Sequence, residues 1–221
     1  MLSVRALTVQ IAAATILDDV DLEVETGTLT ALMGRNGAGK TTFMRSVMGL
    51  IPVRAGSVDF DGTDIARLAA HRRAGLGIGY MPEDRRLVPE LTVRENVLVP
   101  AWAARIADAE ARLARIYRLM PEVESFAGRR AMQLSGGQQK LVALARALMS
   151  GTRMVLLDEP FEGLAPALAR RLVEVLSGLR DQGLTVLLSE SDSTHSEDLV
   201  DAVYVIERGR IGARTGAVGA G

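Results

Sequence analysis

Residues 34–42, GRNGAGKTT, place three glycines, a lysine and two threonines directly after an apolar run. They fit the pattern G-x-x-x-x-G-K-[ST], in which a glycine-rich loop joins a strand to a helix. Glycines let successive backbone N–H groups point at phosphate oxygens, and the helix start adds partial positive charge. Lys40 can bridge the outer phosphates, and the Thr41 hydroxyl can ligate the Mg²⁺ that shares those oxygens.

An ordinary glycine-rich turn is the weaker alternative, because the full motif stands in the strand-loop-helix context that it requires. The sequence therefore predicts a nucleoside triphosphate site. The residues assigned to phosphate binding are Gly34, Arg35, Asn36, Gly37, Ala38, Gly39, Lys40, Thr41 and Thr42.

A second candidate for chemistry is a pair of adjacent carboxylates, Asp158 and Glu159, which end the apolar run of residues 154–157. Sheet proteins bind ligands at the carboxyl ends of their parallel strands. The two acids can divide the work, with Asp158 orienting the Mg²⁺ shell and Glu159 accepting a proton from the attacking water. An Asp-Glu pair alone is more often a solvated turn. Downstream of a phosphate loop, the catalytic interpretation is favoured.

Residues 134–138, LSGGQ, precede a strongly helical run. The Ser135 hydroxyl and the N–H groups of the first helical turn form a second potential anion site, made of Ser135, Gly136, Gly137 and Gln138. Because the phosphate loop already encloses one side of the nucleotide, we expect this second site to close over the outer phosphate of a partner subunit's nucleotide. That geometry predicts a two-fold dimer with two shared sites. A plain helix cap is the alternative.

Strands alternating with helices predict an α/β fold, a P-loop core with a mostly parallel sheet. Residues 4–9 and 20–24 alternate apolar and polar side chains like antiparallel edge strands, which predicts an N-terminal antiparallel β subdomain. From about residue 91 to residue 150, helical periodicity replaces the strand signal and predicts an inserted α-helical lobe. Further strands are expected at 29–33, 57–60, 154–157, 185–189 and 202–206, with helices at 41–48 and 166–179.

We expect one domain over residues 1–221, with the core and its antiparallel part in 1–83 and 151–221 and the helical lobe in 84–150. The 26 basic and 27 acidic residues balance, so nucleic acid is not an expected partner. There is no cysteine, and the apolar runs are of strand length, so neither disulfides nor a membrane span is expected. A GTPase is excluded because the Asn-Lys-x-Asp guanine motif needs a lysine other than Lys40 and Lys140.

GRNGAGKTT, LSGGQQ and VLLDEP occur in the order and spacing of the ABC transporter nucleotide-binding subunits, and the chain resembles that family over nearly its whole length. The phrases YMPEDRRLVPELTVRENV, YRLMPEVE and DEPFEGLAP resemble the branch that powers uptake of branched-chain amino acids, and related amides such as urea, in bacteria.

The resemblance implies a cofactor pair of ATP and Mg²⁺, and an ATPase that drives import as a head-to-tail dimer closes on ATP and reopens after hydrolysis. It also implies specific partners. These are a second cassette subunit, identical or different, a transmembrane permease that docks near Glu83, and indirectly a periplasmic or extracellular solute-binding protein. The chain would then be peripheral, on the cytoplasmic face of a bacterial inner or plasma membrane.

Three positions depart from the wider family pattern. Glu83 stands where most members have glutamine, and it keeps an oxygen ligand toward Mg²⁺. Ser191 stands where a histidine, or in this branch a glutamine, contacts the γ-phosphate; its hydroxyl can donate one hydrogen bond. Ile11 replaces the aromatic residue that stacks on adenine and offers apolar contact alone. His195 is nearby, but a surface histidine is the favoured interpretation.

The predicted catalytic residues are accordingly Lys40, Glu159 and Ser191, and the predicted metal ligands are Thr41, Asp158 and Glu83. Two alternatives remain to the transporter ATPase. A soluble cassette ATPase acting on DNA or ribosomes would usually carry two cassettes, a coiled coil or a basic arm. An ATP-binding regulatory or structural subunit, with weak or no hydrolysis and an active partner cassette, is compatible with Ser191 and Ile11.

Overall fold

The computed structural model describes residues 1–192, 194–212 and 215–216. Its larger sheet has parallel strands in the order β9-β3-β8-β7-β6, with β10 and β11 pairing antiparallel to β9. The strands are β3 (Leu29–Met33), β6 (Ile78–Met81), β7 (Met154–Asp158), β8 (Thr185–Glu190), β9 (Ala202–Glu207), β10 (Arg210–Ile211) and β11 (Thr215–Gly216). All five residues of β7 and all six of β8 are buried, because helices and the second sheet cover this sheet on both faces.

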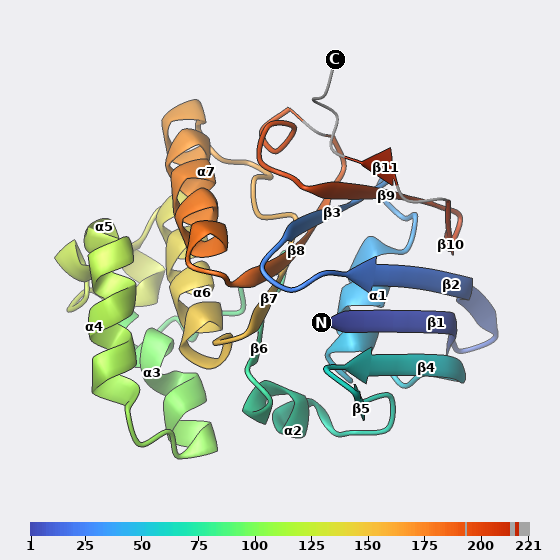
Figure 1. Cartoon of the computed structure of the whole chain (residues 1–221). Coiled ribbons are helices and arrows are strands. Elements are labelled where there is room, and N and C mark those ends of the chain that lie inside the picture. The colour runs from blue at the N-terminus through green and yellow to red at the C-terminus, as the bar shows by residue number, and fades with distance from the viewer. Residues whose placement is uncertain (193, 213–214, 217–221) are drawn as a thin grey trace.

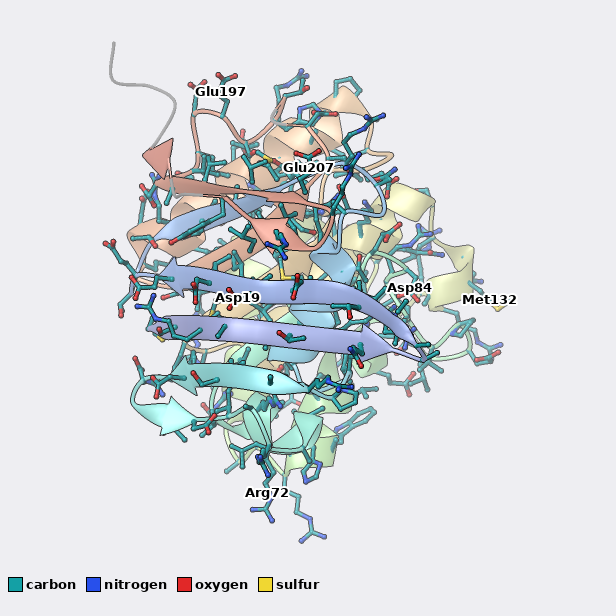
Figure 2. All side chains as sticks on the ribbon, turned by 90° about the vertical axis from the view of Figure 1, so that its right-hand side faces the viewer. Asp19, Arg72, Asp84, Met132, Glu197 and Glu207 are labelled. Atoms are coloured by element: carbon teal, nitrogen blue, oxygen red, sulfur yellow. The ribbon has the colours of Figure 1, made fainter. Side chains whose placement is uncertain are left out.

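A four-stranded antiparallel sheet, in the order β2-β1-β4-β5, forms the other layer of the core. Its strands are β1 (Leu2–Ile11), β2 (Ala14–Val24), β4 (Ala55–Phe60) and β5 (Thr63–Asp64). Inward side chains such as Leu17 and Val20 are buried, whereas Asp19 between them projects from the outer face toward solvent (Figure 2). The two predicted antiparallel strands are therefore confirmed, and each is longer than its alternating stretch. Only β2 lies at an edge, because β1 is flanked by β2 and β4. Helix α1 (Lys40–Val47) lies between the two sheets (Figure 1).

The helices after β6 form a lobe at one side of the parallel sheet, drawn in green to yellow in Figure 1. Helix α7, after β7, covers one face of the sheet, and the short α2 precedes β6. The helices are α2 (Ala70–Gly75), α3 (Val93–Ala104), α4 (Ala109–Leu119), α5 (Pro121–Ser125), the 3₁₀ turn η1 (Ala131–Gln133), α6 (Gly136–Ser150) and α7 (Pro166–Asp181). Within the described chain, no helix combines the length and the apolar character that crossing a bilayer demands.

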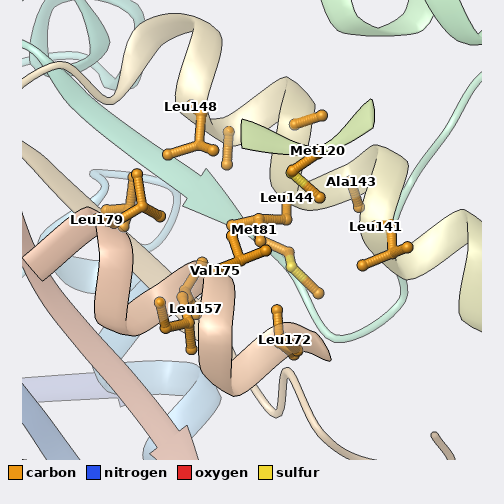
Figure 3. Close-up of a cluster of buried hydrophobic side chains, with 14 of the residues drawn as sticks. Met81, Met120, Leu141, Ala143, Leu144, Leu148, Leu157, Leu172, Val175 and Leu179 are labelled. Atoms are coloured by element: carbon orange, nitrogen blue, oxygen red, sulfur yellow. The ribbon is translucent and has the colours of Figure 1, made fainter. Parts of the chain in front are cut away.

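One apolar cluster runs continuously from the lobe into the sheet. Figure 3 shows Leu144 of α6, Met81 of β6, Val175 of α7 and Leu157 of β7 together in this cluster, with Met81 between Leu144 and Val175 in the view. Helix α6 therefore belongs physically to both parts, and a lobe defined as residues 84–150 shares its core with the parallel sheet.

Strand β6 was not predicted from the sequence, because Gly77 and Gly79 weaken its strand signal. The packing of α6 on β6 explains why residue 79 is a glycine. A Cβ there would lie 2.2 Å from the carbonyl oxygen of Ala147, so α6 crosses the strand at a distance that only glycine permits. This close crossing fixes α6, and with it the Ser-Gly-Gly turn at its start, relative to the sheet.

Candidate functional site

The glycine-rich loop connects the end of β3 to the first turn of α1, as the motif predicted. Gly39 has φ 115°, and a Cβ there would lie 2.9 Å from the Leu17 side chain. A Cβ on Gly34 would lie 2.4 Å from the Ile206 carbonyl oxygen, so strand β9 presses against the start of the loop. The loop opens on a cavity of about 380 Å³, which is lined by Ile16, Asn36, Gly37, Gly39, Lys40, Thr41, Thr42, Glu83, Glu159 and Glu162.

Lys40 lies at the start of α1 and is 5 % exposed. Its ammonium donates hydrogen bonds to the carbonyl oxygens of Gly34 (2.5 Å) and Arg35 (3.2 Å), and it lies 3.0 Å from Glu159 Oε1. The side chain is thus folded over its own loop and paired with the predicted general base. A phosphate entering this cavity competes with those carbonyls and with Glu159 for the ammonium.

Asp158 is fully buried at the end of β7, and three hydroxyl groups donate to its carboxylate. Thr41 Oγ1 (3.2 Å) and Ser189 Oγ (2.7 Å) bind Oδ1, and the Tyr80 hydroxyl (3.3 Å) binds Oδ2. Burial raises the pKa of Asp158, and these hydrogen bonds act in the opposite direction. A buried carboxylate beside the Thr41 hydroxyl is an all-oxygen donor pair, the chemistry that Mg²⁺ prefers. Among the described residues, no group of three or more His, Cys, Asp or Glu side chains is arranged so that it could hold a metal ion by itself.

Glu159 has φ 49°, a left-handed conformation that non-glycine residues adopt rarely. Its N–H donates to the carbonyl oxygen (3.2 Å) and to the hydroxyl oxygen (3.1 Å) of Ser189 in β8. The turn directs the carboxylate back over the phosphate loop, where it pairs with Lys40. The base predicted from the sequence therefore reaches the same cavity as the predicted phosphate-binding lysine, although the two residues come from distant parts of the chain.

Ser191 follows β8 directly and joins three predicted site residues. Its hydroxyl can donate to Glu159 Oε1 (2.7 Å) or to Asn36 Oδ1 (2.8 Å). The same hydroxyl oxygen accepts a hydrogen bond from the Lys40 ammonium (3.1 Å). A second cavity of about 480 Å³ adjoins this point and is bounded by Ser191, Glu159 and His195 among others. His195 is exposed and its ring lies 5.6 Å from that of Phe161.

Glu83 comes two residues after β6 and lines the phosphate-loop cavity. Its pKa is raised, first by desolvation and then by the carboxylates of Glu162, Asp158 and Glu159. A cation placed among these acids would relieve their repulsion.

Ile11 lies at the end of β1 with 46 % of its surface exposed, and it is not among the residues that line the phosphate-loop cavity. Ile16 of β2 lines the cavity instead. The apolar contact with adenine that was expected at Ile11 stays a prediction.

Ser135 caps α6, and its hydroxyl accepts from the Gln138 N–H (3.3 Å) while the Gln138 side chain accepts from the Ser135 N–H (3.0 Å). Ser135 and Gly136 are exposed, and none of residues 135–138 lines the phosphate-loop cavity. Within one chain, the second candidate anion site and the phosphate loop are thus separate.

Sequence reasoning did not identify three residues that hold the carboxylates in place. Tyr80 and Ser189 bind Asp158, and the Lys140 ammonium donates to the Glu159 carbonyl oxygen (2.7 Å). Tyr80 and Ser189 belong to strands whose order the sequence does not specify, and their patterns carry no local signal. Lys140 did stand out in the sequence, because it is the only lysine besides Lys40.

Comparison with known proteins identifies the family of this chain. The family model described as ABC transporter matches residues 17–162. The chain is 35 % identical over 195 residues to the high-affinity branched-chain amino acid transport ATP-binding protein BraG of Pseudomonas aeruginosa, covering 88 % of this chain and 84 % of that protein. It is 34 % identical over 198 residues to the lipopolysaccharide export system ATP-binding protein LptB of Escherichia coli, covering 89 % and 82 %.

Solved structures agree with the fold. A nucleotide-free ATP-binding cassette from an ABC transporter matches with a TM-score of 0.87 and 26 % identity, covering 98 % of this chain and 91 % of that chain. A dimeric bacterial ABC transporter cassette matches with a TM-score of 0.88 at 24 % identity over the full length of both chains. The predicted fold class, an α/β core with an antiparallel β part and a helical lobe, is confirmed. The chain belongs to the ABC transporter family, as an ATP-binding subunit that hydrolyses ATP to power transport.

Proposed function

We propose that this chain drives uptake of branched-chain amino acids, or related small polar solutes, through closure and reopening of a head-to-tail dimer of cassettes. The single observation that carries the mechanistic part is the convergence of Lys40, Thr41 and Glu159 on one cavity. Thr41 is bonded to the buried Asp158, and Lys40 is paired with Glu159. Hydrolysis of a phosphoanhydride needs a base, a cation that binds phosphate and ligands for a metal ion. Glu159, Lys40 and the pair of Thr41 and Asp158 can supply these three functions.

The residues divide into three roles. The loop N–H groups, Lys40 and the α1 terminus bind the phosphates of ATP. Thr41 and Asp158, with Glu83 as a further oxygen donor, would hold Mg²⁺, which would neutralise phosphate charge when bound. Glu159 accepts the proton of the attacking water, and binding of the phosphates to Lys40 releases its carboxylate for that task.

Ser191 retains a function in this scheme. Because its hydroxyl contacts both Lys40 and Glu159, it links the phosphate loop to the base across the cavity. That link favours an active ATPase over a cassette that only binds ATP. The chain also spans 84 % of BraG, a protein described as a transport ATP-binding protein, which favours transport over action on DNA or ribosomes.

The dimer follows from the exposed Ser135 turn. The turn is exposed at a helix N-terminus but does not line the cavity of its own chain, so we expect a second cassette to supply the nucleotide that it faces. Partners of the dimer are a transmembrane permease, docked beside Glu83 and the lobe, and a solute-binding protein that acts through the permease. This places the chain on the cytoplasmic face of the membrane.

Glu159→Gln tests the mechanism. The amide keeps the size of the side chain but cannot accept the proton, so we expect ATP binding to persist while hydrolysis falls by roughly a hundredfold or more. The ATP-bound variant should elute as a stable dimer in size-exclusion chromatography with light scattering. Turnover at the wild-type rate contradicts the assignment of the base.

The transported substrate needs a separate experiment, because BraG and LptB are similarly identical to this chain. The phrases around Glu83 and Glu159 favour solute uptake. The chain would be reconstituted in vesicles with the membrane subunits that copurify with it. We expect a leucine-loaded solute-binding protein to stimulate ATP hydrolysis, and lipopolysaccharide to have no effect. Stimulation by lipopolysaccharide alone would assign the chain to lipid export.

A further inference from the structure

Lys140 is a buried cation that the proposed mechanism leaves without a role. It lies in α6, five residues after Ser135, and is 7 % exposed. Its ammonium donates to the carbonyl oxygens of Glu159 (2.7 Å) and Glu162, both in the connection between β7 and α7. Burial lowers the pKa of Lys140, and the carboxylates of Glu162, Glu159 and Glu83 act against that shift.

The contact falls on the peptide whose conformation aims the base. Glu159 has φ 49°, and a non-glycine residue in this region persists only where its surroundings hold it. Three residues bind the Glu159 backbone. Ser189 accepts the Glu159 N–H on one side. On the other side, the Lys140 ammonium (2.7 Å) and the Glu162 N–H (3.3 Å) both donate to the Glu159 carbonyl oxygen, and the Lys140 contact is the shorter. Rotation of this peptide would swing the carboxylate away from Lys40 and Ser191.

Helix α6 carries both Lys140 and the Ser135 turn, and it is held rigidly against the sheet. Gly137, in its first turn, packs so tightly on α7 that a Cβ there would lie 2.4 Å from Leu168 Cδ2. Residues 135 and 140 are separated by about 7.5 Å of helix rise. A displacement of the helix start is therefore transmitted to the Glu159 carbonyl oxygen with no flexible element between.

We propose that Lys140 is a positioning residue that holds the Glu159 peptide in its catalytic conformation and couples it to engagement of the Ser135 turn with a partner's nucleotide. The inference rests on the proposed roles of Glu159 and Ser135. An ATP bound by one chain would contact the Ser135 turn of the partner chain. Through α6 of that partner chain, it would affect the position of the partner chain's own base, which serves the other ATP. The alternative is a purely structural tie between α6 and the β7–α7 connection.

Lys140→Met removes the donors while nearly keeping the length and the apolar stem of the side chain. We expect kcat to fall by roughly ten- to a hundredfold, because a misplacement of about 1 Å at a catalytic group has effects of that size. The KM for ATP and the nucleotide affinity of the monomer should stay within about twofold, and the Hill coefficient for ATP should fall toward one. Arg118→Met, which removes an exposed cation from α4 of the same lobe, is the matched control and should leave all four quantities unchanged.

A double-mutant cycle separates positioning from general stability. If Lys140 acts through the Glu159 carboxylate, Lys140→Met should lower kcat in the wild type but have almost no further effect in the Glu159→Gln background. Equal losses in both backgrounds, or an unchanged kcat and Hill coefficient, would overturn the inference. Should the methionine variant fail to fold, Lys140→Gln, which keeps one donor group, undergoes the same comparison.

The outcomes also separate this inference from the proposed function. Wild-type turnover by Glu159→Gln alone refutes the base, and the inference falls with it. Slow turnover by Glu159→Gln together with normal turnover by Lys140→Met refutes the inference and leaves the base in place.

Discussion

Glu190, at the end of β8, shows how burial acts on a single residue near the site. Its carboxylate is 3 % exposed, and the buried Ser196 hydroxyl donates to it. Burial raises the pKa of Glu190 to about 7; Ser196 acts in the opposite direction, and the charges of Glu159 and Asp192 raise it further. The site thus carries a carboxyl group that is partly protonated near neutral pH and that no proposed catalytic step uses.

The sign of the resulting pH dependence follows from proton binding. Between the ordinary pKa near 4.5 and the folded value near 7, the folded state binds more protons than the unfolded state. The free energy of unfolding therefore decreases as pH rises through this window. Glu190→Gln removes the titration, so the variant should gain stability relative to the wild type between pH 5 and pH 8, by up to about 3 kcal/mol.

Urea denaturation of the nucleotide-free protein at several pH values measures this difference. Glu207→Gln is the control, because Glu207 is exposed on the surface seen in Figure 2. A difference between Glu190→Gln and the wild type that does not change with pH would show that Glu190 titrates normally.

At the scale of elements, the end of α1 depends on a buried arginine from α2. The Arg73 guanidinium is 2 % exposed and donates to the carbonyl oxygens of Ser46 (2.8 Å), Val47 (2.7 Å), Ala66 (2.8 Å) and Leu68 (2.8 Å). The last carbonyls of a helix lack partners within the helix, and a cation there also complements the helix dipole. Arg73 thereby anchors the helix whose first residue is Lys40.

Gly49 makes room for this guanidinium. A Cβ at Gly49 would lie 2.6 Å from Arg73 Nε, and the residue has φ +70°. Gly62 is a matched control, because it has φ +77° and a Cβ there would meet no atom within 4 Å. Each substitution to alanine adds the same backbone strain, of about 1–2 kcal/mol. We expect Gly49→Ala to lose about 1–3 kcal/mol more than Gly62→Ala, because it also displaces Arg73. Equal losses in thermal denaturation would show that Arg73 adapts without cost.

At the scale of the whole molecule, two helices of the lobe start with the same capping box but differ in exposure. Thr92 caps α3 through the Glu95 N–H (3.2 Å), and Ser135 caps α6 through the Gln138 N–H (3.3 Å). Thr92 is half-buried within the lobe, whereas Ser135 faces solvent where a second cassette is proposed to dock. Substitutions of Thr92 and Ser135 can therefore distinguish the stabilising effect of a helix cap from a role in the dimer.

Thr92→Ala and Ser135→Ala should each cost about 1 kcal/mol of stability, since each removes one capping hydroxyl. We expect only Ser135→Ala to lower ATP hydrolysis, by roughly tenfold, with nucleotide affinity of the monomer nearly unchanged. Differential scanning calorimetry and steady-state ATPase assays provide the two measurements. A parallel fall in ATP affinity for Ser135→Ala would count against a contact with the partner's nucleotide.

The sequence by itself determined the features that lie within one short segment. The phosphate loop, the carboxylates after residues 154–157 and the capped helix at Ser135 are contiguous, so residue types and periodicity sufficed to place them. Strand β3 was predicted at its observed bounds for the same reason, since it is an apolar run that leads into the glycine-rich loop. From these segments the fold class and the family followed.

Only the tertiary structure decided which distant side chains meet. Sheet order brings Ser189 of β8 and Tyr80 of β6 to Asp158, and the crossing of α6 over the sheet brings Lys140 to Glu159. It also places Ile16, and not Ile11, at the cavity. These contacts depend on strand neighbours and helix crossings far apart in the chain, and no local propensity or spacing encodes them.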